Sequence, residues 1–204
     1  YNARKWRLLS APTNNSTQSI ENSWQEGRPS TASDGYGFLA ADTRADFSAR
    51  GFDARGTNTS VKIYNGLMDS WDAVDSTKSP IRNHQGYLVF VPGDRKVAFP
   101  NSNQTTLRTK GALFTQWNLG APVPIPADQF KVIGNPFASP IDIRQLNKTN
   151  IDQAYYVWDP RAGGAYGLGA FITFNFDGTN YTNFLPSPSY PVGIYNTIES
   201  GLAF

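Results

Sequence analysis

Glycine and proline interrupt this chain so often that long helices are not expected. Its 204 residues include 18 Gly and 14 Pro. Glycine loses much conformational freedom in a helix and proline lacks the N–H that the helix needs, so both residues break helical runs. They recur too closely for an uninterrupted amphipathic stretch of about 12 residues. The sequence therefore predicts short extended segments separated by turns.

Several short apolar or alternating segments fit that expectation. The run at Gly86–Val91 is continuously apolar, which is typical of a strand covered on both faces. The predicted strands are Trp6–Ser10, Ser60–Tyr64, Gly86–Val91, Lys131–Gly134, Ala154–Trp158 and Ala170–Phe176. We expect one all-β module over residues 1–204, with two mostly antiparallel sheets packed as a β-sandwich, a jelly roll being one arrangement of them.

Alternation sorts the faces of the segment 170–176. Successive side chains of a strand point to opposite faces. One face would carry Phe171, Thr173 and Asn175, and the wholly apolar other face would carry Ile172, Phe174 and Phe176. The apolar face should therefore meet the core. The following Asp177-Gly178 pair favours a tight reversal into a second strand at 181–184.

One helical turn is expected at residues 139–146. Ser139 would be its N-cap and Pro140 its first helical position.

Composition and charge exclude several classes of protein. The chain has 18 Lys+Arg, 16 Asp+Glu and no Cys. No basic run suggests a nucleic-acid partner, and no apolar run of about 18 residues suggests insertion into a membrane. Disulfides, thiol catalysis and cysteine-ligated zinc are excluded.

Catalytic motifs are lacking as well. The chain has a single histidine, His84, and no G-x-S-x-G motif that would supply a serine nucleophile for it. No phosphate-binding G-x-x-x-x-G-K-[ST] loop occurs either. Paired carboxylates hydrolyse glycosides, but spacing along the chain cannot select a pair among the many aspartates and the three glutamates. We therefore expect no enzyme, with a glycoside hydrolase kept as an alternative.

Aromatic residues make up 14% of the chain. Most of them should fill the core, but exposed rings could stack on sugars. The candidates for such a carbohydrate-binding surface are Trp24, Trp71, Trp117 and Tyr166. Trp71 stands out because acidic residues flank it, which is unusual for a core tryptophan.

The same acidic residues form the candidate metal site. Asp69, Asp72 and Asp75 lie close together in the sequence, and carboxylate oxygens suit calcium. Because no EF-hand-like loop is present, solvated turns are the competing interpretation. No other cofactor is expected.

A series of short motifs gives the chain a family resemblance. In order they are Trp6-Arg7-Leu8-Leu9-Ser10-Ala11-Pro12, Trp24-Gln25-Glu26-Gly27, 86–95 (GYLVFVPGDR), 107–111 (LRTKG), 132–142 (VIGNPFASPID), 156–160 (YVWDP) and 198–204 (IESGLAF). Together they resemble a domain of large Bacteroidota cell-surface proteins exported by the type IX secretion system. In the G-N-P motif, Gly134 and Asn135 predict a tight strand exit before Pro136. The Gly-Asp-Arg motif predicts a hairpin tip with a contact between Asp94 and Arg95.

The resemblance implies a function and a location. It implies a non-enzymatic structural or adhesive module at the outer surface of a Gram-negative bacterium, with other domains of a longer chain or surface proteins as partners. The alternative, a carbohydrate-binding module with exposed aromatic rings, would add glycans as partners. Residues 200–204 resemble the start of a final strand, so more chain is expected after them. In such a protein Asp75-Ser76-Thr77 resembles an O-glycosylation sequence, in which Ser76 would carry the glycan.

Overall fold

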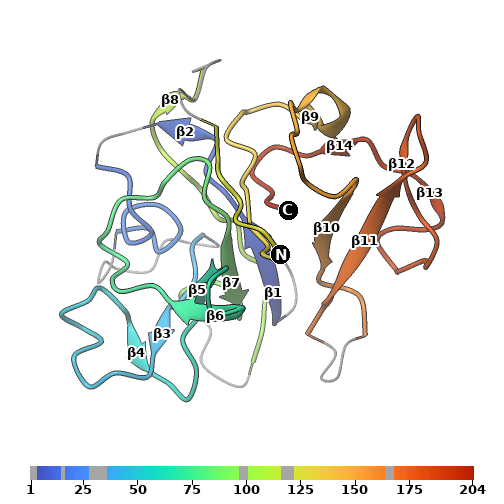
Figure 1. Cartoon of the computed structure of the whole chain (residues 1–204). Coiled ribbons are helices and arrows are strands. Elements are labelled where there is room, and N and C mark those ends of the chain that lie inside the picture. The colour runs from blue at the N-terminus through green and yellow to red at the C-terminus, as the bar shows by residue number, and fades with distance from the viewer. Residues whose placement is uncertain (1–3, 15–16, 28–35, 97–100, 116–121, 164–167) are drawn as a thin grey trace.

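The regular secondary structure of the described residues is almost entirely short β-strands, joined by turns and loops, as the computed structural model shows (Figure 1). The structure describes residues 4–14, 17–27, 36–96, 101–115, 122–163 and 168–204. The strands are β1 (Lys5–Leu9), β2 (Thr13–Asn14), β3 (Ala41–Asp42), β4 (Ala54–Arg55), β5 (Val61–Asn65), β6 (Ser70–Ala73), β7 (Tyr87–Val91), β8 (Ala112–Leu113), β9 (Ile141–Asp142), β10 (Ala154–Asp159), β11 (Ala170–Phe176), β12 (Tyr181–Asn183), β13 (Gly193–Ile194) and β14 (Thr197–Ile198). The predicted all-β, mostly antiparallel architecture with two main sheets is confirmed.

The first main sheet has four antiparallel strands in the order β1-β7-β5-β6. Its inner strand β7 is the predicted apolar run. Tyr87, Val89 and Val91 face one cluster of buried residues, while Leu88 faces another on the opposite side. Burial on both faces explains why this strand is continuously apolar.

The second main sheet has the order β10-β11-β12-β13. Ile172, Phe174 and Phe176 pack in its core, and Phe171 is 41% exposed on the other face. The predicted alternation is thus confirmed. The predicted turn is confirmed too, because Gly178 has a φ of +100° and the Asp177 N–H donates to the Asn180 carbonyl at 3.0 Å.

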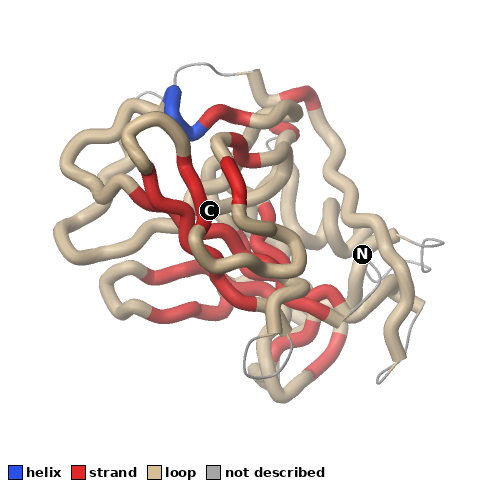
Figure 2. Tube along the Cα trace, turned by 90° about the vertical axis from the view of Figure 1, so that its right-hand side faces the viewer, coloured by secondary structure: helices blue, strands red, loops and turns tan. Residues whose placement is uncertain are grey.

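Long loops and three short strand pairs surround the main sheets (Figure 2). The pairs are β2–β8, β9–β14 and the parallel pair β3–β4. The helical turn predicted at 139–146 is shorter than expected. It is a single 3₁₀ turn at Ile143–Gln145 capped by Asp142, whose carboxylate accepts from the Arg144 N–H, so Ser139 is not the cap.

The last residues of the chain join the two main sheets. Ala203 donates its N–H to the Leu8 carbonyl at 3.2 Å and also bridges to Gly134, while Phe204 exchanges backbone hydrogen bonds with Ile133. Ala203 lies in a small apolar cluster at this junction, against which Trp71 and Trp158 also pack. The C-terminus accordingly lies between the two sheets in Figure 1.

The Gly-Asp-Arg motif is organised differently from the prediction. Arg95 pairs with Asp53 at 2.7 Å, with both side chains nearly buried, rather than with Asp94. The Asp94 carboxylate instead accepts from the Lys96 N–H at 2.8 Å. The local motif therefore makes a long-range ion pair, because the Arg95 side chain is long enough to reach across the fold.

Candidate ligand-binding groove

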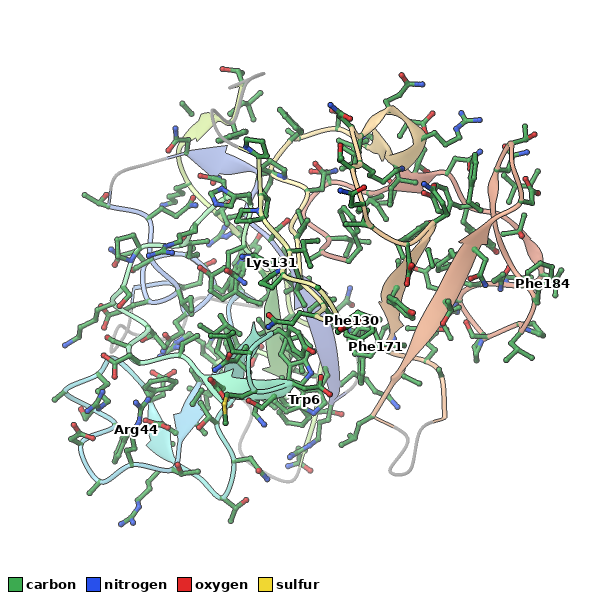
Figure 3. All side chains as sticks on the ribbon, in the orientation of Figure 1. Trp6, Arg44, Phe130, Lys131, Phe171 and Phe184 are labelled. Carbon is green, nitrogen blue, oxygen red and sulfur yellow. The ribbon has the colours of Figure 1, made fainter. Side chains whose placement is uncertain are left out.

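An apolar groove of about 350 Å³ runs along the junction of the two main sheets. Its walls come from the β5–β6 hairpin, from the segment 130–132, from β10 and β11, and from the last residue. The lining residues are Tyr64, Asp69, Trp71, Phe130, Lys131, Val132, Tyr156, Phe171 and Phe204. Figure 3 shows Phe130, Lys131 and Phe171 gathered at this junction, with Phe184 far from it.

The β5–β6 hairpin places Trp71 on one wall. Strand pairing sets Trp71 opposite Tyr64, and their ring centroids are 5.4 Å apart. At the tip, Asp69 adopts a φ of +47° and its carboxylate accepts a hydrogen bond from the Tyr64 hydroxyl. Burial, followed by that hydrogen bond to Asp69, raises the pKa of Tyr64 to about 12. The hydroxyl therefore stays protonated and keeps donating at neutral pH.

Strands β10 and β11 provide the opposite wall. Tyr155 and Val157 point to the core, so Tyr156 points outward by alternation and is 37% exposed. Phe171 pairs with Trp158 across the ladder, and their rings meet edge to face at 5.0 Å. This contact fixes the Phe171 ring at the edge of the groove.

The segment 130–132 closes the third side. Phe130 is 56% exposed and its ring meets Tyr156 at 5.6 Å, nearly perpendicular. The backbone of Gly66 approaches Phe130 so closely that a Cβ on Gly66 would lie 2.7 Å from the Phe130 carbonyl oxygen. A glycine at the hairpin tip is therefore needed for this contact.

The groove can bind ligands through flat apolar faces and a few polar groups. The Trp71 and Phe171 rings lie within 14° of parallel, with centroids 6.4 Å apart. Asp69 and Lys131 supply charges on the lining. Such a combination suits a sugar, which presents an apolar C–H face together with hydroxyls at its edge.

The predicted aromatic candidates are not brought together. Trp71 lines the groove, whereas Trp24 is only 3% exposed and packs edge to face on Tyr87 in the core. Trp24 is thus not available for stacking, and that prediction is wrong. Trp117 and Tyr166 lie outside the described residues.

The sequence reading missed the other aromatic residues of the groove. They are Tyr64, Phe130, Tyr156, Phe171 and Phe204. The alternation of β11 had already placed Phe171 on the face away from the core, and this was the one available signal. Tyr64 lies on the same hairpin as Trp71. Phe130, Tyr156 and Phe204 come from segments far apart in the chain, whose proximity only the fold creates.

The three candidate calcium ligands have separate partners. Asp69 accepts from Tyr64, Asp72 accepts from Asn65 at 2.8 Å, and Asp75 pairs with arginines. Hydrogen bonds from Asn65 and Ser70 lower the pKa of Asp72. Within the described ranges, no group of three or more His, Cys, Asp or Glu residues could hold a metal ion. The geometry gives the shared site no support, and calcium binding stays a prediction.

Ser76 lies at the surface but takes part in a turn. Its hydroxyl donates to the Arg50 carbonyl at 2.8 Å and accepts from the Lys78 N–H at 3.1 Å. A glycan on this oxygen would remove the donated hydrogen bond. O-glycosylation of Ser76 stays a prediction.

Comparisons with protein-family models, with curated proteins and with solved structures return no match to this chain. In the part of the chain that the structure describes, no helix has the length and apolar character required to cross a membrane.

Proposed function

We propose that this chain is a non-catalytic adhesive module that binds glycans in the aromatic groove. The observation that carries the proposal is the Trp71–Phe171 pair, two nearly parallel rings at the border of an apolar groove. Aromatic faces bind sugar rings through their C–H groups, and nearby charged or amide side chains orient the hydroxyls. Rings held by neighbours need little further ordering, which favours binding.

The proposed setting is the outer surface of a Gram-negative bacterium. The ordered motifs that resemble domains of exported Bacteroidota surface proteins support it. In this setting the groove would attach a longer surface protein to glycans, and the rest of the domain would serve as scaffold.

The groove favours binding over glycoside hydrolysis. Hydrolysis by the common mechanisms uses two carboxyl groups on either side of the scissile bond. Among the described residues that line the groove, Asp69 is the only carboxylate, and it is hydrogen-bonded to Tyr64.

A glycan array with the purified chain tests the proposal, run with calcium and with a chelator. Affinities for the glycans that bind should then be measured by calorimetry for the native chain and for Trp71→Ala. We expect the substitution to weaken binding about tenfold or more, because an aromatic stacking contact is lost. Loss of binding in chelator would in addition support the calcium prediction.

Phe184→Ala is the matched control. Phe184 is 70% exposed and does not line the groove, so its removal deletes an aromatic ring without touching the proposed site. Circular dichroism of both variants checks the fold. Absence of glycan binding, or equal binding by folded Trp71→Ala, would overturn the proposal and favour a purely structural module.

A further inference from the structure

A second pocket, of about 240 Å³, lies beside the aromatic groove, and we call it the basic pocket. Its lining residues are Arg82, His84, Gln85, Pro122, Val123, Pro124 and Lys131. Arg82 and Lys131 carry positive charge, and His84 adds an imidazole. No acidic residue belongs to this lining, as far as the structure describes the chain.

No ion pair among the described residues neutralises the positive charge of this basic pocket. In the described part of the chain, the side chains of Arg82, His84 and Lys131 make no ion pair or hydrogen bond. Other arginines are engaged, including Arg44 with Asp42 and Arg108 with Glu26. A guanidinium and an ammonium that line the same pocket suit an anionic ligand.

The backbone holds the two charged groups on opposing segments. The turn that carries Arg82 and His84 is closed by a 3.0 Å hydrogen bond from the Gln85 N–H to the Arg82 carbonyl. This turn then pairs with the segment after Lys131 through a bridge between Gln85 and Ile133. β-Pairing therefore sets the relative positions of the two backbone segments that carry the cations.

Lys131 connects the basic pocket to the aromatic groove, because it lines both. The volume of the pocket is below the roughly 300–1,000 Å³ of sites that enclose drug-sized ligands, so it fits one charged sugar unit rather than a chain. A ligand that fills both the basic pocket and the aromatic groove would combine an anionic group with adjoining sugar rings.

From this continuity we infer that the glycan is acidic. Its carboxylate or sulfate would bind Arg82 and Lys131 in the basic pocket, while the next sugar ring lies against Trp71. This inference rests on the proposed function, since it takes the aromatic groove as a sugar site, and it adds the chemical class of the ligand.

Two matched pairs of probes test the charge preference by calorimetry at low ionic strength. Oligogalacturonate is compared with its methyl ester, and dextran sulfate with dextran. We expect at least one anionic probe to bind about tenfold or more tightly than its neutral partner, because charge-assisted hydrogen bonds are lost in the neutral form. The pair that shows the preference identifies the anion as carboxylate or sulfate. The preference should fall as salt is added.

The variant Arg82→Gln/Lys131→Gln should abolish the preference and keep the fold. Arg55→Gln is the control: it also removes an arginine charge, but on β4, which belongs to the separate β3–β4 pair and lies at the lower left in Figure 1, away from Lys131 as labelled in Figure 3. If Arg55→Gln reduced the preference for the anionic probe as much as the double variant does, the preference would reflect general electrostatic attraction, and the inference would be overturned. A native chain that binds neutral and anionic probes equally, with loss in Trp71→Ala, would overturn the inference but keep the proposed function. No binding to any glycan would overturn both.

Discussion

The indole ring of Trp71 and the phenyl ring of Phe171 come from different sheets and lie within 14° of parallel, 6.4 Å apart. Their two strands, β6 and β11, are separated by nearly half of the chain. The contact therefore helps to join the sheets as well as to form one border of the groove. A structural and a binding role must be separated at these two residues.

A double-mutant cycle measures the structural part. We expect Trp71→Ala and Phe171→Ala to show a coupling of about 0.5–1.5 kcal/mol in the free energy of unfolding, because offset aromatic pairs contribute that much beyond burial. Chemical denaturation of the native chain, the single variants and the double variant gives the value. Phe184→Ala paired with Trp71→Ala should be additive. A coupling of zero between Trp71 and Phe171 would show that the rings do not stabilise the sheet junction.

Removing the Asn135 side chain of the Gly-Asn-Pro motif should strongly lower the free energy of unfolding. It is fully buried, and its amide donates to the carbonyls of Ser139 and Ile198 at 2.9 and 3.0 Å. Its side-chain oxygen also accepts from the Phe137 N–H. Asn135→Ala leaves these groups unpaired, so we expect it to lower the free energy of unfolding by about 3 kcal/mol or more.

The exposed Asn101→Ala is the control for that substitution and should have little effect. Urea denaturation compares the two variants. If Asn135→Ala lowered the free energy of unfolding no more than Asn101→Ala does, the stabilising role of the Asn135 hydrogen bonds would be contradicted.

These cases show how far the sequence could predict the fold. Alternation alone predicted which face of strand 170–176 is buried, and the Asp177-Gly178 pair alone predicted the hairpin that follows. Both predictions succeeded because both patterns are local. Trp24 was wrongly proposed as an exposed ring, because its burial depends on contacts with residues far along the chain. The fold buries that segment, including Gln25, whose amide donates to the Gly51 carbonyl at 3.0 Å.

The candidate site was less predictable than the strands. Trp71 could be singled out from the acidic residues around it, but Phe130 and Lys131 reach the groove through pairing of distant segments. The partner of Arg95 was missed for the same reason. Contacts between residues far apart in the chain leave no periodic pattern in a single sequence.

Acid should destabilise the connection between residues 186 and 191 through Asp159. The Asp159 carboxylate is buried and accepts from the Ser187 hydroxyl at 2.6 Å and from the Arg161 and Ser189 N–H groups. Burial alone would raise its pKa, but these hydrogen bonds outweigh burial and lower it. A lowered pKa in the folded state gives stability that is complete above the unfolded value of about 3.9 and disappears as pH falls through the folded value.

The free energy of unfolding of the native chain should therefore fall below about pH 4. Asp159→Asn should reduce this pH dependence and lower stability at neutral pH by about 1–3 kcal/mol, because an amide nitrogen replaces an accepting oxygen. Denaturation at a series of pH values measures both effects. The exposed Asp152→Asn serves as control, and an unchanged acid profile in Asp159→Asn would contradict the assignment.

Of the ion pairs in the described ranges, the one between Arg95 and Asp53 should be the most sensitive to substitution. Their side chains are 5% and 9% exposed, and Asp53 also accepts from the Ala40 N–H at 2.8 Å and the Gln25 amide at 2.9 Å. Removing one partner of a buried pair leaves an uncompensated charge, which costs about 3–5 kcal/mol. Arg95→Met should lose that amount in the free energy of unfolding.

Arg50→Met is the matched control, because Arg50 pairs with Asp46 and Asp75, whose side chains are 54% and 82% exposed. Ion pairs between solvated groups contribute little, so this variant should unfold close to the native midpoint. The buried pair also explains how the Gly-Asp-Arg motif ties the end of the first sheet to the loop that carries Asp53. If Arg95→Met were as stable as Arg50→Met, that loop would have to be held by its apolar contacts alone, with Phe52 in the core as the residue to test next.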